Sequence, residues 1–497
     1  MILGARRSPT TLAAVLLCLA GGLAFGFVIL KMSLLYIVAL LGALFTVWLT
    51  LKKPELSIIA IVVIIASVVD VYKLPLVPLG PGSLNVTDIL VFVLLALSFW
   101  RHLSTRDSQP TASSPVSWLL LLFIGYAVCT ALLSIVLLGM DLNTVLRLFR
   151  VVSYYLIYFM ITNLVCTKQQ IRFLVNALFL VAALVVVAML VQLVMGDSVQ
   201  LIPGKQYRVD VMEAEVDAMR LQPPGQTLLF ACLLTVIALL TNLRSALSLR
   251  SRYLYLLALL GAGVLLTYVR TYLLALALVI TLYFVVARPE QRLRLAKFVM
   301  LGMLLFALLA AGGWGAGGKF QSTLTAMSGR FLTLFAGKEL VQTNSLNDRQ
   351  IENSYALKEI REHPLLGIGL GQDYRPKLYG PDDEITYYVH NVYLWLVLDF
   401  GLPGCLVFFL FYLTFLVRAF KSARNEPDPY LRSIAVGALL MGVAALPMAL
   451  VIPLFLEWHS IVVLAILIGL SETILMHRGV QAAPEAALPA PAGEQVT

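Results

Sequence analysis

The chain has 497 residues, of which 60% are hydrophobic and only 13% are charged, and its formal net charge is +9. Soluble domains carry roughly 25% charged residues, so this composition excludes a soluble globular protein and indicates a polytopic membrane protein. The positive charge is concentrated in short loops between apolar segments, which is a topology signal, and nothing about it indicates nucleic-acid binding.

About fourteen apolar segments are each near the 17–25 residues that a helix needs to cross about 30 Å of hydrocarbon. In chain order they lie at 10–30, 32–51, 55–72, 87–100, 116–138, 145–165, 171–195, 225–242, 253–268, 270–287, 297–313, 391–417, 431–452 and 454–476. Only helices or closed barrels satisfy the backbone in lipid, and these runs lack the alternation of barrel strands. The predicted fold is all-α, with about 12–14 transmembrane helices.

Short loops rich in Lys and Arg predict the orientation. Such loops contain residues 6–7, 52–53, 101–106, 168–172, 244–252, 288–297, 418–432 and 478. With the spans above they all fall on one side, so the positive-inside rule makes that side, and both termini, cytoplasmic. Arg6 and Arg7 precede a long apolar core, which we interpret as an uncleaved anchor.

Four regions follow from these spans. Residues 1–313 form the N-terminal transmembrane helices, with an outer loop at 196–224, and 314–390 form a large extracytoplasmic loop. Residues 391–478 hold the last transmembrane helices, and the Ala/Pro-rich residues 479–497 are expected to be a disordered cytoplasmic tail.

A helix is predicted within the large outer loop, over residues 348–362. Its apolar positions and candidate caps are Ile351, Tyr355, Leu357, Ile360, Asn347 and Asp348. The segment "HPLLGIGLG" then ends it, because Pro364 and three alternate glycines force an irregular turn. Helix termination alone would also account for these glycines.

Several cationic side chains are predicted on the outer side, against the positive-inside bias. They are Arg147, Arg150, Lys205, Arg208, Arg220 and Arg270. Guanidinium groups that converge on one membrane face suit an anion with several phosphate oxygens. Individually, Arg147 is also compatible with snorkelling to lipid headgroups, and Arg208 with an ion pair to Asp210 or Glu213.

His390 is the histidine with the most suggestive surroundings. It lies at the outer end of an apolar segment, next to Asn391 and near Tyr388. A packed structural histidine is the alternative interpretation. We find no Asp-x-Asp pair or His/carboxylate cluster placed to hold a divalent cation, so the sequence predicts no metal and no other cofactor.

Two motifs carry a resemblance to a known family. "HPLLGIGLG" at 363–371, followed by "HNVYLWLVLDFGLPG" from His390 to Gly404, resembles the signature of the O-antigen ligase and O-antigen polymerase superfamily of bacterial envelope enzymes. The match covers about 349–404 closely. Upstream, "RLQPPGQTLLFACL" and "TYVRTYLLALAL" look like the family's arginine-containing loop and arginine-led span.

The resemblance implies a metal-independent glycosyltransferase of the bacterial cytoplasmic membrane whose active site faces outward. Its donor would be a polyprenyl-diphosphate-linked glycan, and its acceptor a lipid A core or another glycan, so ligase and polymerase both stay open. Arg220 and Arg270 would hold the diphosphate and His390 would act on the acceptor hydroxyl. Further candidate site residues are Arg147 and Arg150 for the diphosphate and Asn391, Tyr388 and Arg349 as supporting side chains.

The chemistry of these residue types agrees with those roles. Charge grows on the lipid diphosphate as the glycosidic bond breaks, and arginines placed there stabilise the transition state. A histidine can remove the proton of a sugar hydroxyl during attack, which gives inversion in a single displacement.

The main rival is a transporter or flippase of lipid-linked oligosaccharide. Such folds usually contain internal repeats and ionisable residues near the membrane midplane, and neither pattern is evident here. An intramembrane protease and a polyprenyl-monophosphate-dependent glycosyltransferase are disfavoured, because Gly-x-Ser-x-Gly and an acidic first outer loop are missing.

Overall fold

The computed structural model describes most of the chain from the third predicted span onward. The described residues are 48, 52–66, 76–79, 82–104, 114–195, 201, 205–211, 214–243, 251–313, 344–377 and 386–485. The predicted spans at 10–30 and 32–51, apart from Trp48, lie outside them. The described part is almost entirely helical, which confirms the all-α polytopic class.

The helices follow the predicted spans in order. They are α3 (Pro54–Ala66), α4 (Val86–Ser104), α5 (Pro115–Val136), α6 (Leu142–Ser153), the 3-10 turn η3 (Tyr154–Leu156), α7 (Ile157–Leu164), α8 (Lys168–Met195), α9 (Gln226–Asn242), α10 (Arg252–Leu266), α11 (Arg270–Val286), α12 (Pro289–Gly313), α15 (Asn344–Glu362), α16 (Val392–Asn425), α17 (Pro429–Met448) and α18 (Trp458–Glu485). Within the described residues, 6 helices are long and apolar enough to cross a membrane, and shorter apolar helices of 10–17 residues accompany them.

Two antiparallel hairpins interrupt the helices. β1 (Leu76–Leu79) pairs with β2 (Gly82–Asn85), and β3 (Lys205–Val211) pairs with β4 (Ala214–Gln222). The second hairpin occupies the outer loop predicted at 196–224, and its strands were not foreseen. The alternation of apolar and charged residues along 207–211 was the available signal.

The centre of the bundle is an aromatic cluster between α5, α16 and the segment just before α18. The Phe408 ring lies 5.1 Å from the Phe123 ring and 5.3 Å from the Phe455 ring. Small residues let other helices approach closely: a Cβ on Gly437 of α17 would lie 2.4 Å from Thr235 Oγ1 of α9. Close backbone approach of this kind is typical of helices that pack in lipid.

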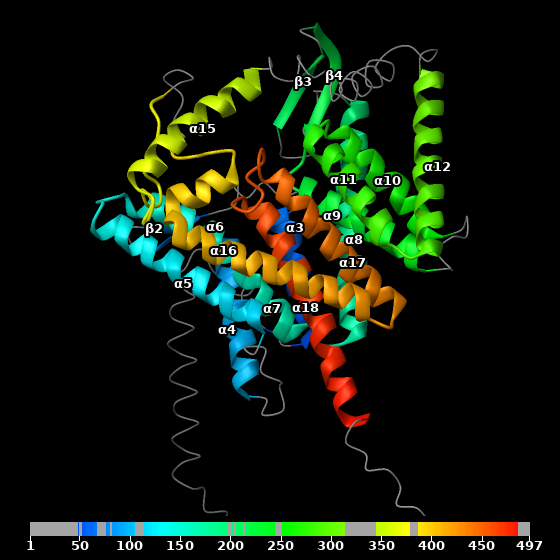
Figure 1. Ribbon diagram of the computed structural model, residues 1–497, viewed down its shortest axis with the longest axis horizontal. Helices are drawn as coiled ribbons and strands as arrows, with labels where there is room; N and C mark the ends of the chain where they lie inside the picture. The colour runs from blue at the N-terminus through cyan, green and yellow to red at the C-terminus, as the bar shows by residue number, and fades with distance from the viewer. Residues whose placement is uncertain are drawn as a thin grey trace, which may run out of the picture.

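Basic residues from separate helix ends gather at one end of the bundle. Lys168 at the start of α8 forms an ion pair with Asp428 at the start of α17, and the Arg294 side chain of α12 donates to the Thr241 carbonyl of α9 at 3.0 Å. Two of the basic segments predicted to share a side, 168–172 and 418–432, are thus in contact. In Figure 1 the hairpin β3–β4 and α15 lie at the top, and the C-terminal end of α18 lies at the bottom.

Helix α15 differs in detail from its prediction. It begins at Asn344, so Asn347 and Asp348 lie inside it and are not its caps. Of the expected apolar positions, Ile351 and Leu357 are each 42% exposed, whereas Glu352 is buried. At the other end of the chain, α18 continues to Glu485, beyond the predicted boundary at 478.

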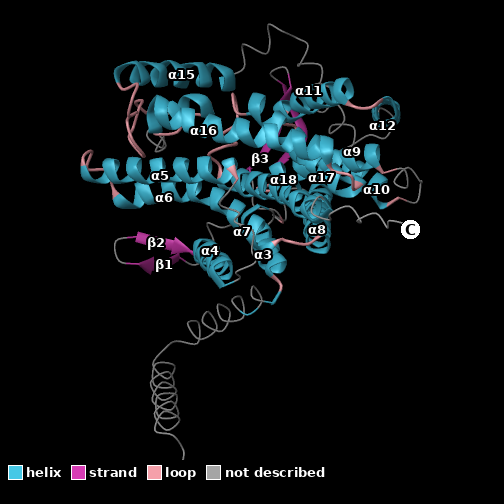
Figure 2. Ribbon diagram, turned by 60° about the horizontal axis from the view of Figure 1, so that its bottom comes forward, coloured by secondary structure: helices cyan, strands magenta, loops and turns pink. Residues whose placement is uncertain are grey.

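Helix α16 is broken at Gly401, where the backbone has φ 66° and ψ 179°. The segment after α15 fills this break. Ile368 N–H donates to the Leu398 carbonyl at 2.7 Å, and Leu402 N–H donates to the Pro364 carbonyl at 2.9 Å. We call this pair of backbone hydrogen bonds the backbone clamp. Figure 2 shows α15 alongside α16.

The glycines of "GIGLG" are required by this arrangement, so helix termination is only part of their role. Gly367, Gly369 and Gly371 have φ values of 70°, 87° and 86°. Residues other than glycine rarely adopt this backbone region. A Cβ on Gly367 would lie 2.4 Å from the Leu398 carbonyl oxygen. The two sequence motifs of the resemblance therefore form one structural unit.

Gly401→Ala is expected to disrupt this unit. The added Cβ would lie 2.0 Å from the Leu365 carbonyl oxygen, and the glycine-only backbone conformation adds strain of about 1–3 kcal/mol. We expect a lower thermal midpoint in detergent. Gly125→Ala in α5 is the matched control, because no atom lies within 4 Å of its added Cβ. Equal midpoints for the two variants would contradict the role of the clamp.

Candidate active site

His390 lies immediately before α16 and contacts a carboxylate of α15. Its Nδ1 is 2.8 Å from Glu352 Oε2, and the Glu352 side chain is only 4% exposed while the His390 side chain is 39% exposed. The described residues form no hydrogen bond with Nε2. The imidazole is therefore held through one ring nitrogen and accessible on its other side. Glu352 is a site residue that sequence reasoning missed.

Neighbouring residues fix the loop that carries His390. The Tyr388 ring lies 4.9 Å from the imidazole, nearly perpendicular to it at 88°, and the Tyr374 hydroxyl donates to the Tyr388 carbonyl at 3.0 Å. Asn391 is the N-cap of α16, because its side chain accepts from Tyr393 N–H at 3.1 Å. Asn391 and Tyr388 thus both help to fix the loop that carries His390.

Arg349 is half-buried on α15, one turn before Glu352. Burial lowers the pKa of Arg349, while the nearby charges of Glu352 and Asp348 raise it; an arginine still stays protonated at neutral pH. Burial also raises the pKa of the Tyr388 phenol, as do the charges of Glu457 and Glu352. Glu352 and Tyr388 therefore contact the imidazole directly, while Arg349 and Glu457 interact electrostatically with Tyr388.

The two arginines of α6 take different partners. The Arg147 guanidinium donates to the Tyr387 hydroxyl at 2.9 Å, which joins α6 to the loop of His390. Arg150 instead pairs with the buried Asp88 of α4 at 2.9 Å, and Asp88 also accepts from the Tyr154 hydroxyl at 2.8 Å. The structure therefore brings Arg147 toward His390 but holds Arg150 on a carboxylate.

Arg270 is the first residue of α11 and is partly buried. The preceding turn has an unusual backbone: Tyr268 has φ 51°, in the left-handed region that glycine usually occupies after a helix. Its N–H donates to the Leu265 carbonyl at 3.0 Å, which closes α10. This turn sets the direction in which α11, and with it Arg270, leaves the end of α10.

Contacts around Glu457 connect α11 to the loop of His390. The Glu457 carboxylate interacts electrostatically with Tyr388 and with Tyr272 of α11. Thr227, in the first turn of α9, hydrogen-bonds with the Tyr272 hydroxyl at 3.2 Å and with the Ser460 hydroxyl at 2.8 Å. The starts of α9, α11 and α18 therefore meet at the end of the bundle where His390 lies.

The backbone of Arg220 lies in β4, paired with Tyr207 of β3. β4 ends at Gln222, and a short turn leads from there into α9. Arg220 therefore lies just upstream of α9, the helix that contacts α11. The side chain of Arg220 is outside the described part.

The expectation that no His/carboxylate cluster could hold a cation is wrong. At the end of α15, ligand atoms of Glu359, Glu362 and the following His363 lie within 4.8 Å of one another, and these side chains are largely exposed. Residues three and four apart share one face of a helix, which explains the cluster. The sequence spacing Glu-x-x-Glu-His could have revealed this cluster.

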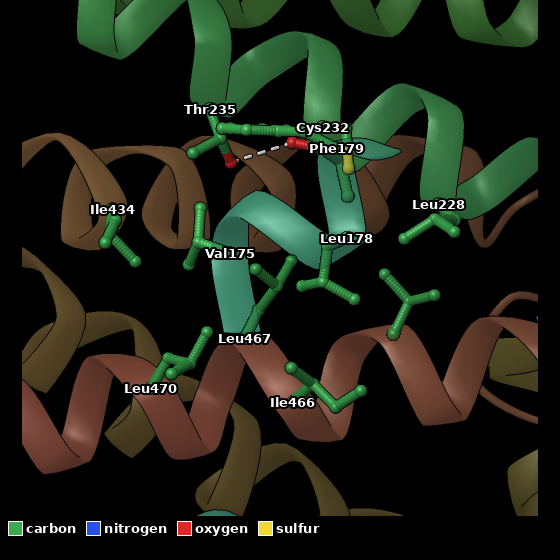
Figure 3. A pocket seen from close by; sticks show the side chains of 12 residues that line it. Val175, Leu178, Phe179, Leu228, Cys232, Thr235, Ile434, Ile466, Leu467 and Leu470 are labelled. Atoms are coloured by element: carbon green, nitrogen blue, oxygen red, sulfur yellow. Dashed lines mark hydrogen bonds between the residues drawn. The ribbon is translucent and has the colours of Figure 1, made fainter. Parts of the chain in front are cut away.

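A small cavity lies elsewhere, between α8, α9, α17 and α18 (Figure 3). Its volume is about 20 Å³, and its lining is apolar except for Thr235, whose hydroxyl donates to the Ala231 carbonyl at 2.9 Å. Such a space is close to the size of one water molecule and offers no free polar group. It is a packing gap with no catalytic side chain.

These features define a class of protein: an integral membrane protein with a polar site built by α15, the loop of His390 and the adjoining helix ends. Residues 255–409 match the family model described as O-Antigen ligase. This match contains both motifs, at 363–371 and 390–404, and confirms their resemblance to the O-antigen ligase superfamily. The matched region includes Arg270, Arg349, Glu352 and His390. No curated protein matches the chain.

Proposed function

We propose that this protein is a glycosyltransferase that transfers a polyprenyl-diphosphate-linked glycan to an acceptor hydroxyl at the outer leaflet of the bacterial cytoplasmic membrane. The observation that carries the proposal is the accessible imidazole of His390, held by a buried carboxylate inside the O-antigen ligase domain. The domain match supports the donor class, since O-antigen ligase-type enzymes handle membrane-bound glycans.

His390 is the general base. With Nδ1 engaged by Glu352, Nε2 is the nitrogen left to remove the proton of the acceptor hydroxyl. The acceptor oxygen attacks the anomeric carbon while the bond to the diphosphate breaks. A single displacement of this kind inverts the anomeric configuration.

Arg270 and Arg220 hold the diphosphate in this proposal, and Arg147 contributes from α6. Charge-assisted, bidentate hydrogen bonds suit phosphate oxygens, and the N-terminus of α11 adds favourable backbone N–H groups beside Arg270. Arg150 has a structural role in this proposal, because its charge is already paired with that of Asp88. Arg349 and Tyr388 support His390.

The orientation follows from the basic residues. Their shared end of the bundle is the cytoplasmic end, which puts both termini in the cytoplasm and His390 at the outer face. The regions 314–390 and 391–478 then correspond to the outer loop and the last membrane helices. A lipid-linked donor reaches the site from the outer leaflet.

The direct test is turnover by purified protein in liposomes with a polyprenyl-diphosphate-linked oligosaccharide. Lipid A core or a second donor molecule serves as acceptor, and extension of one or the other distinguishes ligase from polymerase. Release of free polyprenyl diphosphate is the expected result. Passage of intact donor across the bilayer without cleavage would instead identify a transporter.

We expect EDTA to leave this turnover unchanged, because cationic side chains stabilise the leaving diphosphate without a metal ion. The measurement is the initial rate with and without chelator, followed by addition of Mg²⁺ or Mn²⁺. The variant His363→Ala examines the cluster on α15 separately. Loss of activity in EDTA, restored by a divalent cation, would show that the reaction depends on metal.

A further inference from the structure

We infer that Glu352 is the positioning residue for His390, and that it fixes the imidazole tautomer and stabilises the imidazolium formed during transfer. This inference rests on the proposed role of His390 as a base. Glu352 lies on a different element, α15, and it acts on the acceptor only through His390.

The burial of Glu352 is the first argument. Its side chain is 4% exposed, and a buried carboxylate is costly unless it is paired and hydrogen-bonded. Its oxygen Oε2 accepts from His390 Nδ1–H at 2.8 Å and lies 3.4 Å from the His390 backbone N–H. Both contacts are to the same residue, so the carboxylate is directed at His390.

The architecture is the second argument. The backbone clamp fixes the segment after α15 to the break in α16, whereas His390 directly precedes α16. The Asn391 cap and the hydrogen bond from Val392 N–H to the Ala449 carbonyl, 3.0 Å, fix the start of α16 itself. Glu352 and His390 are therefore held against each other by backbone contacts on both sides.

The chemistry follows from this geometry. The carboxylate keeps the Nδ1 proton in place, so the lone pair is on Nε2. As the acceptor oxygen bonds to the anomeric carbon, its proton moves to Nε2 and the electron pair of the breaking bond leaves with the diphosphate. The resulting imidazolium lies beside the Glu352 charge, and its proton then passes to solvent. A carboxylate that acts in this way through a histidine changes turnover by as much as about 10⁴-fold in hydrolases.

The test is a double-mutant cycle on the full-length protein, with kcat and donor KM measured in EDTA. Glu352→Ala is expected to lower kcat by about 10²–10⁴-fold and to leave donor KM unchanged. Glu352→Gln keeps the shape and an acceptor oxygen but loses the charge, so its kcat should fall between those of wild type and Glu352→Ala. In a His390→Ala background, Glu352→Ala should cause no further loss, because the two residues act as a unit.

Glu362→Gln is the matched control, the same chemical change at an exposed position of the same helix. Thermal midpoints in detergent exclude unfolding as the cause of any loss. The inference is overturned if the fold-losses in kcat of Glu352→Ala and His390→Ala multiply in the double variant. It is also overturned if the Glu352 variants raise the donor KM and leave kcat unchanged. Full activity of the Glu352 variants alongside an inactive His390→Ala overturns this inference alone, whereas an active His390→Ala overturns the general-base proposal as well.

Discussion

His390→Ala is expected to abolish glycan transfer, with kcat lowered by about 10²–10⁴-fold, while the protein still inserts in the membrane. The imidazole has an accessible surface and a fixed Nδ1 contact, so its removal takes away the group that receives the acceptor proton. The measurement is the release of free polyprenyl diphosphate by purified protein in liposomes, normalised to the amount of folded protein.

Two further results would make that loss interpretable. Donor binding should persist in His390→Ala, because the arginines that hold the diphosphate are unchanged. His363→Ala, which removes an exposed histidine at the end of α15, should retain its turnover in EDTA. Transfer at the wild-type rate by His390→Ala would remove the general-base proposal.

Arg270→Ala is expected to reduce kcat by about 10²–10³-fold, the usual effect of removing one group that stabilises developing negative charge. Arg270→Lys should recover only part of this loss, because an ammonium keeps the charge but not the planar bidentate fork. The measurement is donor cleavage over a range of donor concentrations, which separates weaker binding from slower chemistry. Arg220→Ala should show a smaller loss in the same assay.

Arg252→Ala provides the matched control. Arg252 starts α10 at the basic end of the bundle, where it donates to the Asn176 side chain at 3.3 Å, so its loss removes a comparable charge away from His390. Its turnover should remain near that of wild type. Normal donor use by Arg270→Ala would exclude the proposed diphosphate contact.

Much of the fold follows from hydropathy because each lipid-spanning helix needs its own long apolar run. Every predicted span from 55 onward contains a described helix, although α12 begins before its predicted span at 297–313, and α16 and α18 end beyond theirs at 417 and 476. The main internal difference is the span predicted at 145–165, which η3 divides into α6 and α7. Hydropathy does not detect such a turn, because its three residues are far fewer than the window over which an apolar run is recognised.

The site was predicted less completely. His390, Asn391 and Tyr388 are adjacent in sequence, so a motif reveals them together. Glu352 is 38 residues from His390, and in the sequence it is one of several charged residues on a polar helix. Only tertiary packing distinguishes the buried carboxylate from its exposed neighbours. The pairing of Arg150 with Asp88 likewise joins two helices that the sequence does not relate.

The backbone clamp has a consequence for which sequence changes the His390 site tolerates. Because main-chain groups make the clamp, the exposed Leu365 and Leu366, each 66% exposed, can change without loosening it. α15, which carries Glu352, is thereby tied to α16, and His390 lies directly before α16. Sequence changes on the exposed surface of the linking segment therefore leave the His390–Glu352 pair assembled.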